Sequence, residues 1–488
     1  MASEFCLPTF GYQARLKHCA TMLPEEPNSR VKTFFSRNGM VILGFIFILS
    51  LIALIVVGTI QNKSASENFK YGIVFDAGSS HTTMYIYKWS AEKMNDTGLV
   101  YEIEACKVKG PGISAYALRL HDIPVYLTQC MGKAKDIIPK YKHQETPVYL
   151  GATAGMRLLR MENQELSDMI LSSVTSVFDS YPFNFQGANI IEGSEEGAYG
   201  WITINYLMGK IKEKNIYKFI PWRKTESPAT YGALDLGGAS TQIAYVPETT
   251  NSVSSDKLMH FRLYGKNYTV FTTSYLCYGK DQALLRKLAK DAQELTIQGT
   301  GDFLQCRDSI LDLFSVNYCT DSDCTFDGVI RPPFSVKFEA FSAYYYSMNF
   351  LNLTSDKVSS WDMTTEKMKE YCAMPWDKVS NAFARVKESY RSEYCFAGTY
   401  ILLLLKKYNF TEYWNQIDFI DKIDDNAEAG WTLGYMLNLT NMIPAELPKP
   451  KPFTRPTYIT LMVCFSLVLA IVFILGTIIF HKSLNFWQ

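Results

Sequence analysis

Two long uncharged apolar stretches constrain this chain more than any other feature of its sequence. They run from Met40 to Ile60 and from Tyr458 to Phe480, 21 and 23 residues without a charge. At about 1.5 Å of rise per residue, each would cross the ~30 Å hydrocarbon layer of a bilayer as a helix. A signal peptide has a shorter apolar region, and it has a shorter preceding segment than the 39 residues found here. We therefore expect two transmembrane helices, at 40–60 and 458–480, that enclose one large segment.

The segment between the spans is expected to lie outside the cytosol. Three basic residues just before the first span favour a cytoplasmic N-terminus, whereas three before the second favour the opposite side. Eight cysteines between the spans favour an oxidising compartment. Asn-x-Ser/Thr sequons indicate glycosylation and stand at Asn62 (expected to be too close to the membrane for use), Asn95, Asn267, Asn352, Asn409 and Asn438. We expect a domain outside the cytosol at 61–457, with cytoplasmic tails at 1–39 and 481–488.

The composition indicates a folded protein that binds no nucleic acid. Of the 488 residues 48% are apolar, which is ample for sizeable cores, and the 48 basic residues balance 48 acidic ones. A formal net charge of zero excludes a strongly basic nucleic-acid binder and an acidic disordered chain. The four prolines in Leu447 to Pro456 predict an extended, semi-rigid stalk before the second span.

A weak internal repeat predicts two related halves. YGIVFDAGSSHTTMYIY (71–87) and YGALDLGGASTQIAYV (231–246) each read as an apolar strand ending in Asp, a Gly/Ser turn and a second strand. Helical spacing of apolar residues follows at 125–138, 164–178, 200–212 and 281–293. Alternating strands and helices indicate an α/β fold. We expect two similar halves that face one another across a cleft.

Four glycine turns have the composition of phosphate-binding loops. Besides the two repeated turns, PVYLGATAGMRLL (147–159) and IIEGSEEGAYGWITINYL (190–207) read as a strand, a turn and the start of a helix. Gly lets backbone N–H groups close on an anion, and a helix N-terminus favours phosphate further. Asp76 and Asp235, at the ends of the repeated strands, would suit Mg²⁺ or Ca²⁺. The alternative for each is an ordinary turn aspartate that binds its own backbone.

Hydrolysis at a nucleotide phosphate site also needs a base that activates water. Glu195 and Glu196 precede Gly197 at the start of a predicted helix. Glu196 is the candidate base, although a glutamate at a helix start more often serves as a capping or dipole-stabilising residue. Three other catalytic patterns, GxxxxGK[ST], HExxH and GxSxG, are absent from the sequence.

Five motifs in order carry a resemblance to a known family. DAGSSHT, GATAGMR, EEGAYGW, DLGGASTQ and AGWTLGYMLN resemble the five apyrase conserved regions of the ecto-nucleoside triphosphate diphosphohydrolases, most closely the vascular ecto-apyrase type. The resemblance implies two actin-like (ribonuclease H-like) lobes with a nucleotide cleft between them. It also implies Ca²⁺- or Mg²⁺-dependent hydrolysis of extracellular ATP and ADP to AMP and phosphate, an activity that ends purinergic signalling.

The resemblance assigns roles to individual residues. Glu196 matches the general base, and Ser240 and Gln242 match residues that orient the attacking water. Asp76 and Asp235 match residues that hold the metal through its waters, and Trp431 would lie near its hydration shell. Tyr346 is the candidate for stacking on the base, with aromatic core packing as the alternative. The matching phosphate-loop positions are Ser79, Ser80, His81 and Thr153, with Gly237, Gly238 and Ala239 in the opposite loop.

One departure from the family pattern concerns the cysteines. Between the helix DQALLRKLAKDAQ and Cys306 the family carries a longer segment with two more cysteines, which indicates a deletion or splice variant here. Family pairing implies the bridges Cys106–Cys130, Cys319–Cys324 and Cys372–Cys395. Cys277 and Cys306 lose their usual partners. They either pair with one another or, if their Cα atoms lie more than ~7 Å apart, stay unpaired.

The resemblance also implies a division into lobe I (61–206), lobe II (207–428) and a return to lobe I with the stalk (429–457). One alternative function is a catalytically impaired splice form or a nucleotide-binding adhesion or sensing protein. Another is an intracellular actin-like kinase or chaperone ATPase, which the sequons and cysteines disfavour. Paired spans would also permit a homo-oligomer through the membrane helices. The sequence leaves open the preference for ATP or ADP and any lipidation of Cys6 or Cys19.

Overall fold

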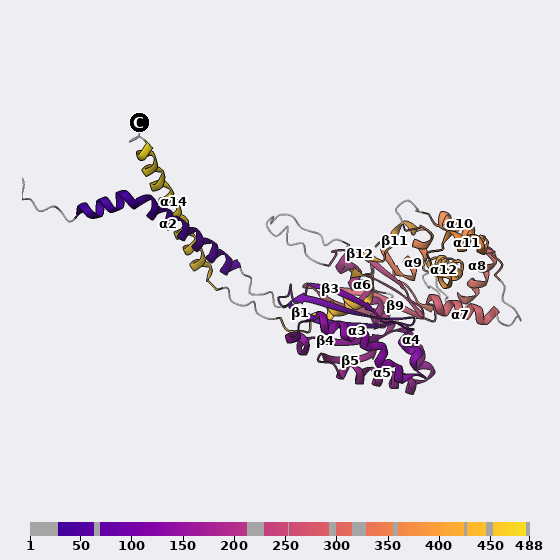
Figure 1. Cartoon of the computed structure of the whole chain (residues 1–488). Coiled ribbons are helices and arrows are strands. Elements are labelled where there is room, and N and C mark those ends of the chain that lie inside the picture. Colours follow the sequence, from indigo (N-terminus) through magenta and orange to yellow (C-terminus); the bar gives the residue numbers. More distant parts are fainter. Residues whose placement is uncertain are drawn as a thin grey trace, which may run out of the picture. The chain divides into compact units, whose positions relative to one another are not determined.

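The structure is a computed structural model that falls into two compact units. One comprises Met1–Glu67 with Lys449–Gln488, and the other comprises Asn68–Pro448 (Figure 1). We refer to them as the helical unit and the globular unit. The structure describes residues 28–62, 69–211, 229–251, 253–291, 299–314, 328–354, 360–423, 427–445 and 452–484.

The described part of the helical unit contains two long helices, α2 (Asn28–Asn62) and α14 (Arg455–Leu484). Within them, 38–61 and 455–479 are long and apolar enough to span a membrane, with only 11% and 6% of their most apolar windows buried. Both predicted spans therefore lie in mostly exposed apolar helices. α2 begins 12 residues before the expected span, and α14 takes in the end of the expected stalk; residues 1–27 and 446–451 lie outside the described residues.

The end of α2 is hydrogen-bonded to the residues that precede α14. Gln61 Nε2 donates to the carbonyl of Phe453 at 3.2 Å, and the N–H of Phe453 donates back to Gln61 Oε1 at 3.1 Å. The Gln61 side chain is buried. These two hydrogen bonds satisfy both the N–H and the C=O of the Gln61 side-chain amide. The amide lies at the ends of two apolar helices, where an unpaired polar group would be costly.

The globular unit contains two mixed sheets built on one plan. The first has the strand order β3-β2-β1-β4-β5 and the second the order β11-β10-β6-β7-β9-β8. In the first sheet β1 pairs antiparallel with β2 and parallel with β4, and in the second β6 pairs antiparallel with β7 and parallel with β10. The predicted internal repeat is therefore confirmed as a repeated topology.

The strands of the first sheet are β1 (Phe69–Ala77), β2 (Thr82–Ser90), β3 (Val100–Lys107), β4 (Pro147–Ala152) and β5 (Asn184–Ile190). Those of the second are β6 (Gly232–Leu236), β7 (Ser240–Tyr245), β8 (Leu258–Leu263), β9 (Lys266–Leu276), β10 (Phe338–Ser342) and β11 (Ile417–Phe419). A small hairpin is formed by β12 (Lys422–Ile423) and β13 (Ala427–Glu428).

Within the described ranges, the helices of the globular unit are α3 (Ile123–Ile137), α4 (Ala154–Glu162), α5 (Gln164–Asp179), α6 (Gly193–Leu207), α7 (Lys280–Asp291), α8 (Phe303–Leu311), α9 (Ala343–Phe350), α10 (Trp361–Cys372), α11 (Trp376–Ala382), α12 (Glu388–Lys407) and α13 (Trp431–Thr440). Short 3₁₀ turns occur at Ile113–Tyr116, Leu120–Asp122, Lys140–Glu145, Ser255–Lys257, Asp312–Phe314 and Trp414–Gln416.

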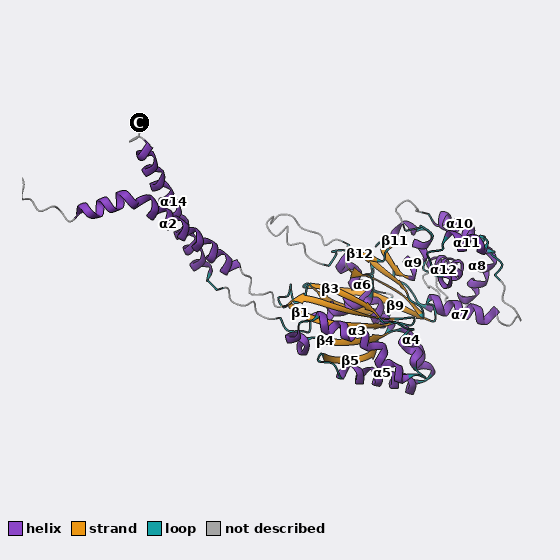
Figure 2. Ribbon diagram, viewed as in Figure 1, coloured by secondary structure: helices purple, strands orange, loops and turns teal. Residues whose placement is uncertain are grey.

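Helices and sheets alternate in layers (Figure 2). One core lies between the first sheet and α3 and α5, and another between the second sheet and α8, α9, α10 and α12. A third core joins both sheets to α6 and α13. Strand side chains alternate accordingly: Leu234 and Leu236 enter the outer core of the second sheet, and Ala233 enters the shared one. Residues 196–206 of α6 are all buried, as expected for a helix enclosed on all sides.

The predicted helices at 125–138 and 164–178 are confirmed nearly residue by residue in α3 and α5. The helix predicted at 200–212 is displaced, since α6 begins at Gly193. Glycines in the first turn interrupt the helical pattern of apolar residues, so that pattern does not show where the helix begins. A capping box between Glu192 and Glu195 fixes its start. α6 contacts the second sheet and α13 contacts the first, so the boundary between lobes at residue 206 remains a proposal.

Two of the expected disulfides form. Cys106–Cys130 joins β3 to α3 with a Cα–Cα distance of 5.8 Å, and Cys372–Cys395 joins α10 to α12 at 5.1 Å. The expected pair Cys319–Cys324 lies outside the described residues.

Of the two alternatives for Cys277 and Cys306, the structure has the unpaired one, and both are half-buried free cysteines. The Cys306 thiol, on α8, lies beside the Thr399 hydroxyl of α12, whereas Cys277 sits in the turn between β9 and α7 with a φ of 71°. Despite the shortened segment before it, α8 contributes Phe303 and Ile310 to the outer core of the second sheet.

Candidate active site

The two repeated turns meet at the ends of β1 and β6. Asp76 stands opposite Thr83 of β2 and Gly151 of β4, and Asp235 stands opposite Gln242 of β7. The turns approach so closely that a β-carbon on Gly238 would lie 2.6 Å from Ser79 Oγ. A side chain at 238 would therefore displace the Ser79 side chain. The predicted phosphate loops of the two sheets thus lie against each other.

The remaining predicted phosphate-loop residues lie around the same turns. Thr153 is buried at the start of α4; its N–H donates to the carbonyl of Ala77 at 3.1 Å, and its hydroxyl does not cap the helix. His81 is exposed, and Ser80 Oγ lies 2.9 Å from its Nδ1. Desolvation, followed by the charge of Lys107, lowers the pKa of His81. His81 is therefore favoured as a neutral hydrogen-bonding group.

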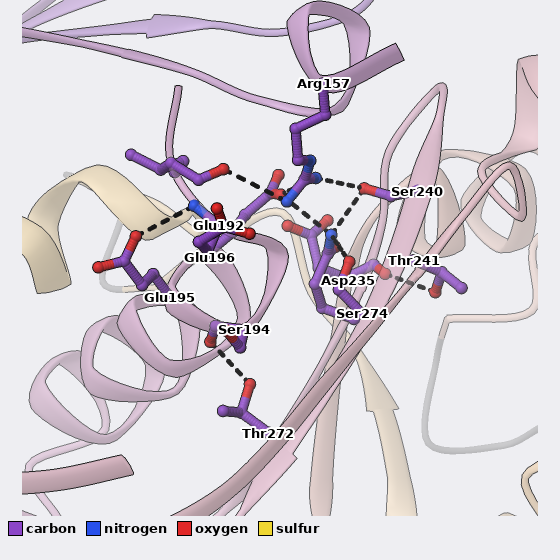
Figure 3. A network of polar contacts seen from close by, with 12 residues as sticks. Arg157, Glu192, Ser194, Glu195, Glu196, Asp235, Ser240, Thr241, Thr272 and Ser274 are labelled. Atoms are coloured by element: carbon purple, nitrogen blue, oxygen red, sulfur yellow. Dashed lines mark hydrogen bonds and ion pairs between the residues drawn. The ribbon is translucent and has the colours of Figure 1, made fainter. Parts of the chain in front are cut away.

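The structure separates the roles of the two candidate glutamates (Figure 3). Glu195 accepts a hydrogen bond from the N–H of Glu192 at 3.0 Å and completes the capping box of α6. Glu196 is buried and extends toward Arg157, Ser240 and Gln242. The capping alternative therefore applies to Glu195, and Glu196 remains the candidate base.

Glu196 belongs to a compact polar network. Arg157 Nη2, from α4, donates to Glu196 Oε2 at 2.7 Å and to Ser240 Oγ at 3.1 Å. Gln242 Nε2 lies 3.0 Å from Glu196 Oε2, 2.7 Å from Ser240 Oγ and 3.0 Å from Ser274 Oγ. The predicted base and both predicted water-orienting residues are thus in direct contact.

Three acidic groups influence one another across this site. Burial, and then the charge of Glu196, raises the pKa of Asp76 to about 8 and that of Asp235 to about 7. Burial also raises the pKa of Glu196, and the Arg157 guanidinium opposes that rise. A bound cation would offset this concentration of negative charge.

The two aspartates have the donors that a hard cation requires. One carboxylate oxygen of each, Oδ1, is buried and has no hydrogen-bond partner among the described residues, and the same holds for the indole N–H of Trp431. Within the described ranges no group of three or more His, Cys, Asp or Glu residues is arranged to hold a metal directly. Mg²⁺ keeps several waters when it binds to one or two carboxylates, so these residues fit a cation held through water.

Trp431 and Tyr346 are placed differently from each other. The Trp431 ring is buried at the first turn of α13 and packs on Gly151. Tyr346 is 54% exposed on α9, and its hydroxyl donates to Asp421 Oδ1 at 2.9 Å. The alternative of simple core packing for Tyr346 is therefore wrong, and its exposed ring is available for stacking.

Arg157 and Ser274 are site residues that sequence reasoning missed. Arg157 closes the motif GATAGMR, so its position one helical turn after Thr153 could have indicated it. Ser274 lies in β9 outside every motif, and only the pairing of β7 with β9 brings it to Gln242. No signal in the sequence marks Ser274.

Comparison with known proteins gives consistent matches. The model of the GDA1/CD39 (nucleoside phosphatase) family matches residues 62–296 and 289–452. Ectonucleoside triphosphate diphosphohydrolase 1 of Bos taurus is 50% identical over 511 residues, which cover 96% of this chain and 99% of the relative. Ectonucleoside triphosphate diphosphohydrolase 3 of Homo sapiens is 37% identical, covering 91% and 93%.

Among solved structures, nucleoside triphosphate hydrolases from Neospora caninum share the fold, with a TM-score of 0.54 and 13% identity over 77% of this chain and 93% of that one. The family model matches in two parts, which overlap at residues 289–296 of this chain. These residues lie beside the segment that the sequence indicates as shortened.

Proposed function

The chain belongs to the GDA1/CD39 (nucleoside phosphatase) family, and from this premise we propose that it hydrolyses nucleoside tri- and diphosphates. The reaction would convert ATP and ADP to AMP and phosphate by direct attack of water. The observation that carries the proposal is the contact of Glu196 with Gln242, beside two aspartates that each have an unpartnered buried oxygen.

Each part of the site has a task in this reaction. Glu196 takes the proton of the water as it attacks phosphorus, and Ser240 and Gln242 orient that water. Backbone N–H groups of the two facing turns, with Ser79, Ser80, His81 and Thr153, hold the phosphate oxygens. A divalent cation, Ca²⁺ or Mg²⁺, held through water by Asp76 and Asp235 near Trp431, would neutralise negative charge on the phosphate oxygens. No nucleophile on the protein is required.

The rest of the molecule supports an ecto-enzyme. Two apolar helices suit a two-span membrane protein, and two disulfides suit an oxidising compartment. Asn95, Asn267, Asn352 and Asn409 are exposed, whereas Asn438 is half-buried in α13. We propose that the globular unit is extracellular, that both termini are cytoplasmic, and that the activity ends signalling by extracellular nucleotides. Association of subunits through the membrane helices would be compatible with this arrangement.

The decisive experiment is turnover by the purified full chain. ATP and ADP are supplied separately with Ca²⁺ or Mg²⁺, and phosphate, ADP and AMP are measured by chromatography. We expect AMP and phosphate from both substrates and no turnover in EDTA. Nucleotide binding without product release would instead support the sensing alternative. Loss of mass after treatment of intact cells with a peptide-N-glycosidase tests the extracellular location.

A further inference from the structure

Ser274 contacts the site from a strand that no motif marks. Thr272 and Ser274 lie two residues apart on β9 and so face the same side of the sheet, toward the first turn of α6. Thr272 Oγ1 donates to the carbonyl of Ser194 at 2.8 Å, and Ser274 Oγ accepts from Gln242 Nε2 at 3.0 Å (Figure 3). A β-carbon on Gly193 would lie 2.3 Å from Ser274 Oγ, so glycine is required for this packing.

The Gln242 amide has more acceptors around its nitrogen than it has hydrogens. Nε2 carries two hydrogens, and Glu196 Oε2, Ser240 Oγ and Ser274 Oγ all lie within 3.0 Å of it. An ionised carboxylate can only accept, so Glu196 requires the nitrogen at this end of the amide. The opposite atom, Oε1, is buried and has no partner within the described part of the chain. Oε1 is therefore free to accept a hydrogen bond from a water.

This arrangement changes when the base does its work. Once Glu196 has taken a proton, it can donate as well as accept, and it no longer forces the nitrogen to face it. Ser240 Oγ is shared with Arg157 Nη2 at 3.1 Å. Ser274 does not ionise, so its hydroxyl oxygen can accept the hydrogen bond from Gln242 both before and after the proton transfer.

Building on the proposed function, we propose that Ser274 is a positioning residue for the attacking water. It holds the Gln242 amide nitrogen toward Glu196 and leaves the carbonyl oxygen for the water throughout the reaction. Ser274 acts through Gln242 and touches no reacting atom itself.

The first test is the kinetics of Ser274→Ala in the full chain. We expect kcat for ATP to fall about tenfold, the size expected for loss of one buried neutral hydrogen bond. KM should stay unchanged because the proposed role of the hydroxyl is to hold Gln242 and not the substrate. Thr269→Ala is the matched control on the same strand, since its hydroxyl contacts His260 at 3.1 Å on the surface. An unchanged kcat in Ser274→Ala would overturn the proposal.

The second test asks whether Ser274 acts through Gln242. Gln242→Ala should lower kcat about a hundredfold, and adding Ser274→Ala to it should lower kcat no further. If Ser274→Ala lowers kcat by the same factor in the wild type and in Gln242→Ala, the proposal is overturned. A general folding defect caused by Ser274→Ala would give that result. A wild-type protein without ATP turnover would contradict the proposed function itself, whereas an active wild type with multiplying effects contradicts only the role of Ser274.

Discussion

Arg157 and Glu196 form a buried ion pair, with 2.7 Å between Nη2 and Oε2 and side chains only 12% and 10% exposed. Arg157 comes from the helix after β4, and Glu196 comes from the helix after β5. The pair therefore ties two of the four glycine turns together. It also opposes the effect of burial on the proposed base, which would otherwise hold the proton more tightly.

Replacing Arg157 should shift the acid limb of the pH–rate profile. Burial raises the pKa of Glu196 and Arg157 lowers it, so Arg157→Met raises that pKa further. The base is active when deprotonated, so activity should disappear at a higher pH than in the wild type as the pH falls. The profile of kcat/KM measures the shift. Arg160→Met, exposed on the same helix, is the control, and identical acid limbs in all three proteins would contradict this coupling.

Glu196→Gln should nearly abolish turnover while the site keeps its shape. The amide has the size of the carboxylate but cannot take a proton, and loss of a general base costs about 10²–10⁴ in rate. Binding of a nucleotide with its metal should persist because the aspartates and turns are unchanged. Glu195→Gln is the matched control, since that residue caps α6. Turnover near the wild-type rate in Glu196→Gln would remove Glu196 from the mechanism.

Asp76→Asn and Asp235→Asn should each reduce activity by weakening the cation site. Each replacement removes a negative charge and one of the oxygens that now has no partner. The concentration of Ca²⁺ or Mg²⁺ that restores half-maximal activity after chelation should therefore rise in both variants. Variants that respond to metal as the wild type does would leave the two residues as ordinary turn aspartates.

The sequence predicted the repeated strands and the glycine turns because both depend on short local patterns. Period-two alternation and a strand-end aspartate were enough to place Asp76 and Asp235. The local pattern alone did not separate Glu195 from Glu196, which are adjacent at a helix start and differ by a 100° turn of the helix; only the family resemblance favoured Glu196. Ser274 reaches Gln242 through strand pairing between β7 and β9, a long-range relation without a local pattern.

Cys277 and Cys306 should be free thiols in the active enzyme. Both are unpaired in the structure, and burial raises the pKa of the Cys306 thiol, which slows its reaction with alkylating agents. Alkylation after denaturation without reductant should label both, while peptides containing Cys106–Cys130 and Cys372–Cys395 stay cross-linked. A peptide that links Cys277 to Cys306 in active protein would contradict the structure.

Glu339 should make the stability of the globular unit depend on pH. It is 1% exposed on β10, directly opposite Asp418 of β11, and burial followed by the charge of Asp418 raises its pKa from 4.5 to about 8. The folded state therefore holds a proton that the unfolded chain has released. The stability that this group contributes is complete below about pH 4.5 and declines as the pH rises to about 8.

Glu339→Gln removes this dependence because an amide does not titrate. Its melting temperature should match that of the wild type near pH 4.5 and should exceed it at pH 8, where the wild type has lost that contribution. Thermal unfolding of the detergent-solubilised full chain across this range measures the difference, with the exposed Glu412→Gln as the control. A constant difference between variant and wild type at every pH would mean that Glu339 keeps the same charge in the folded and unfolded states.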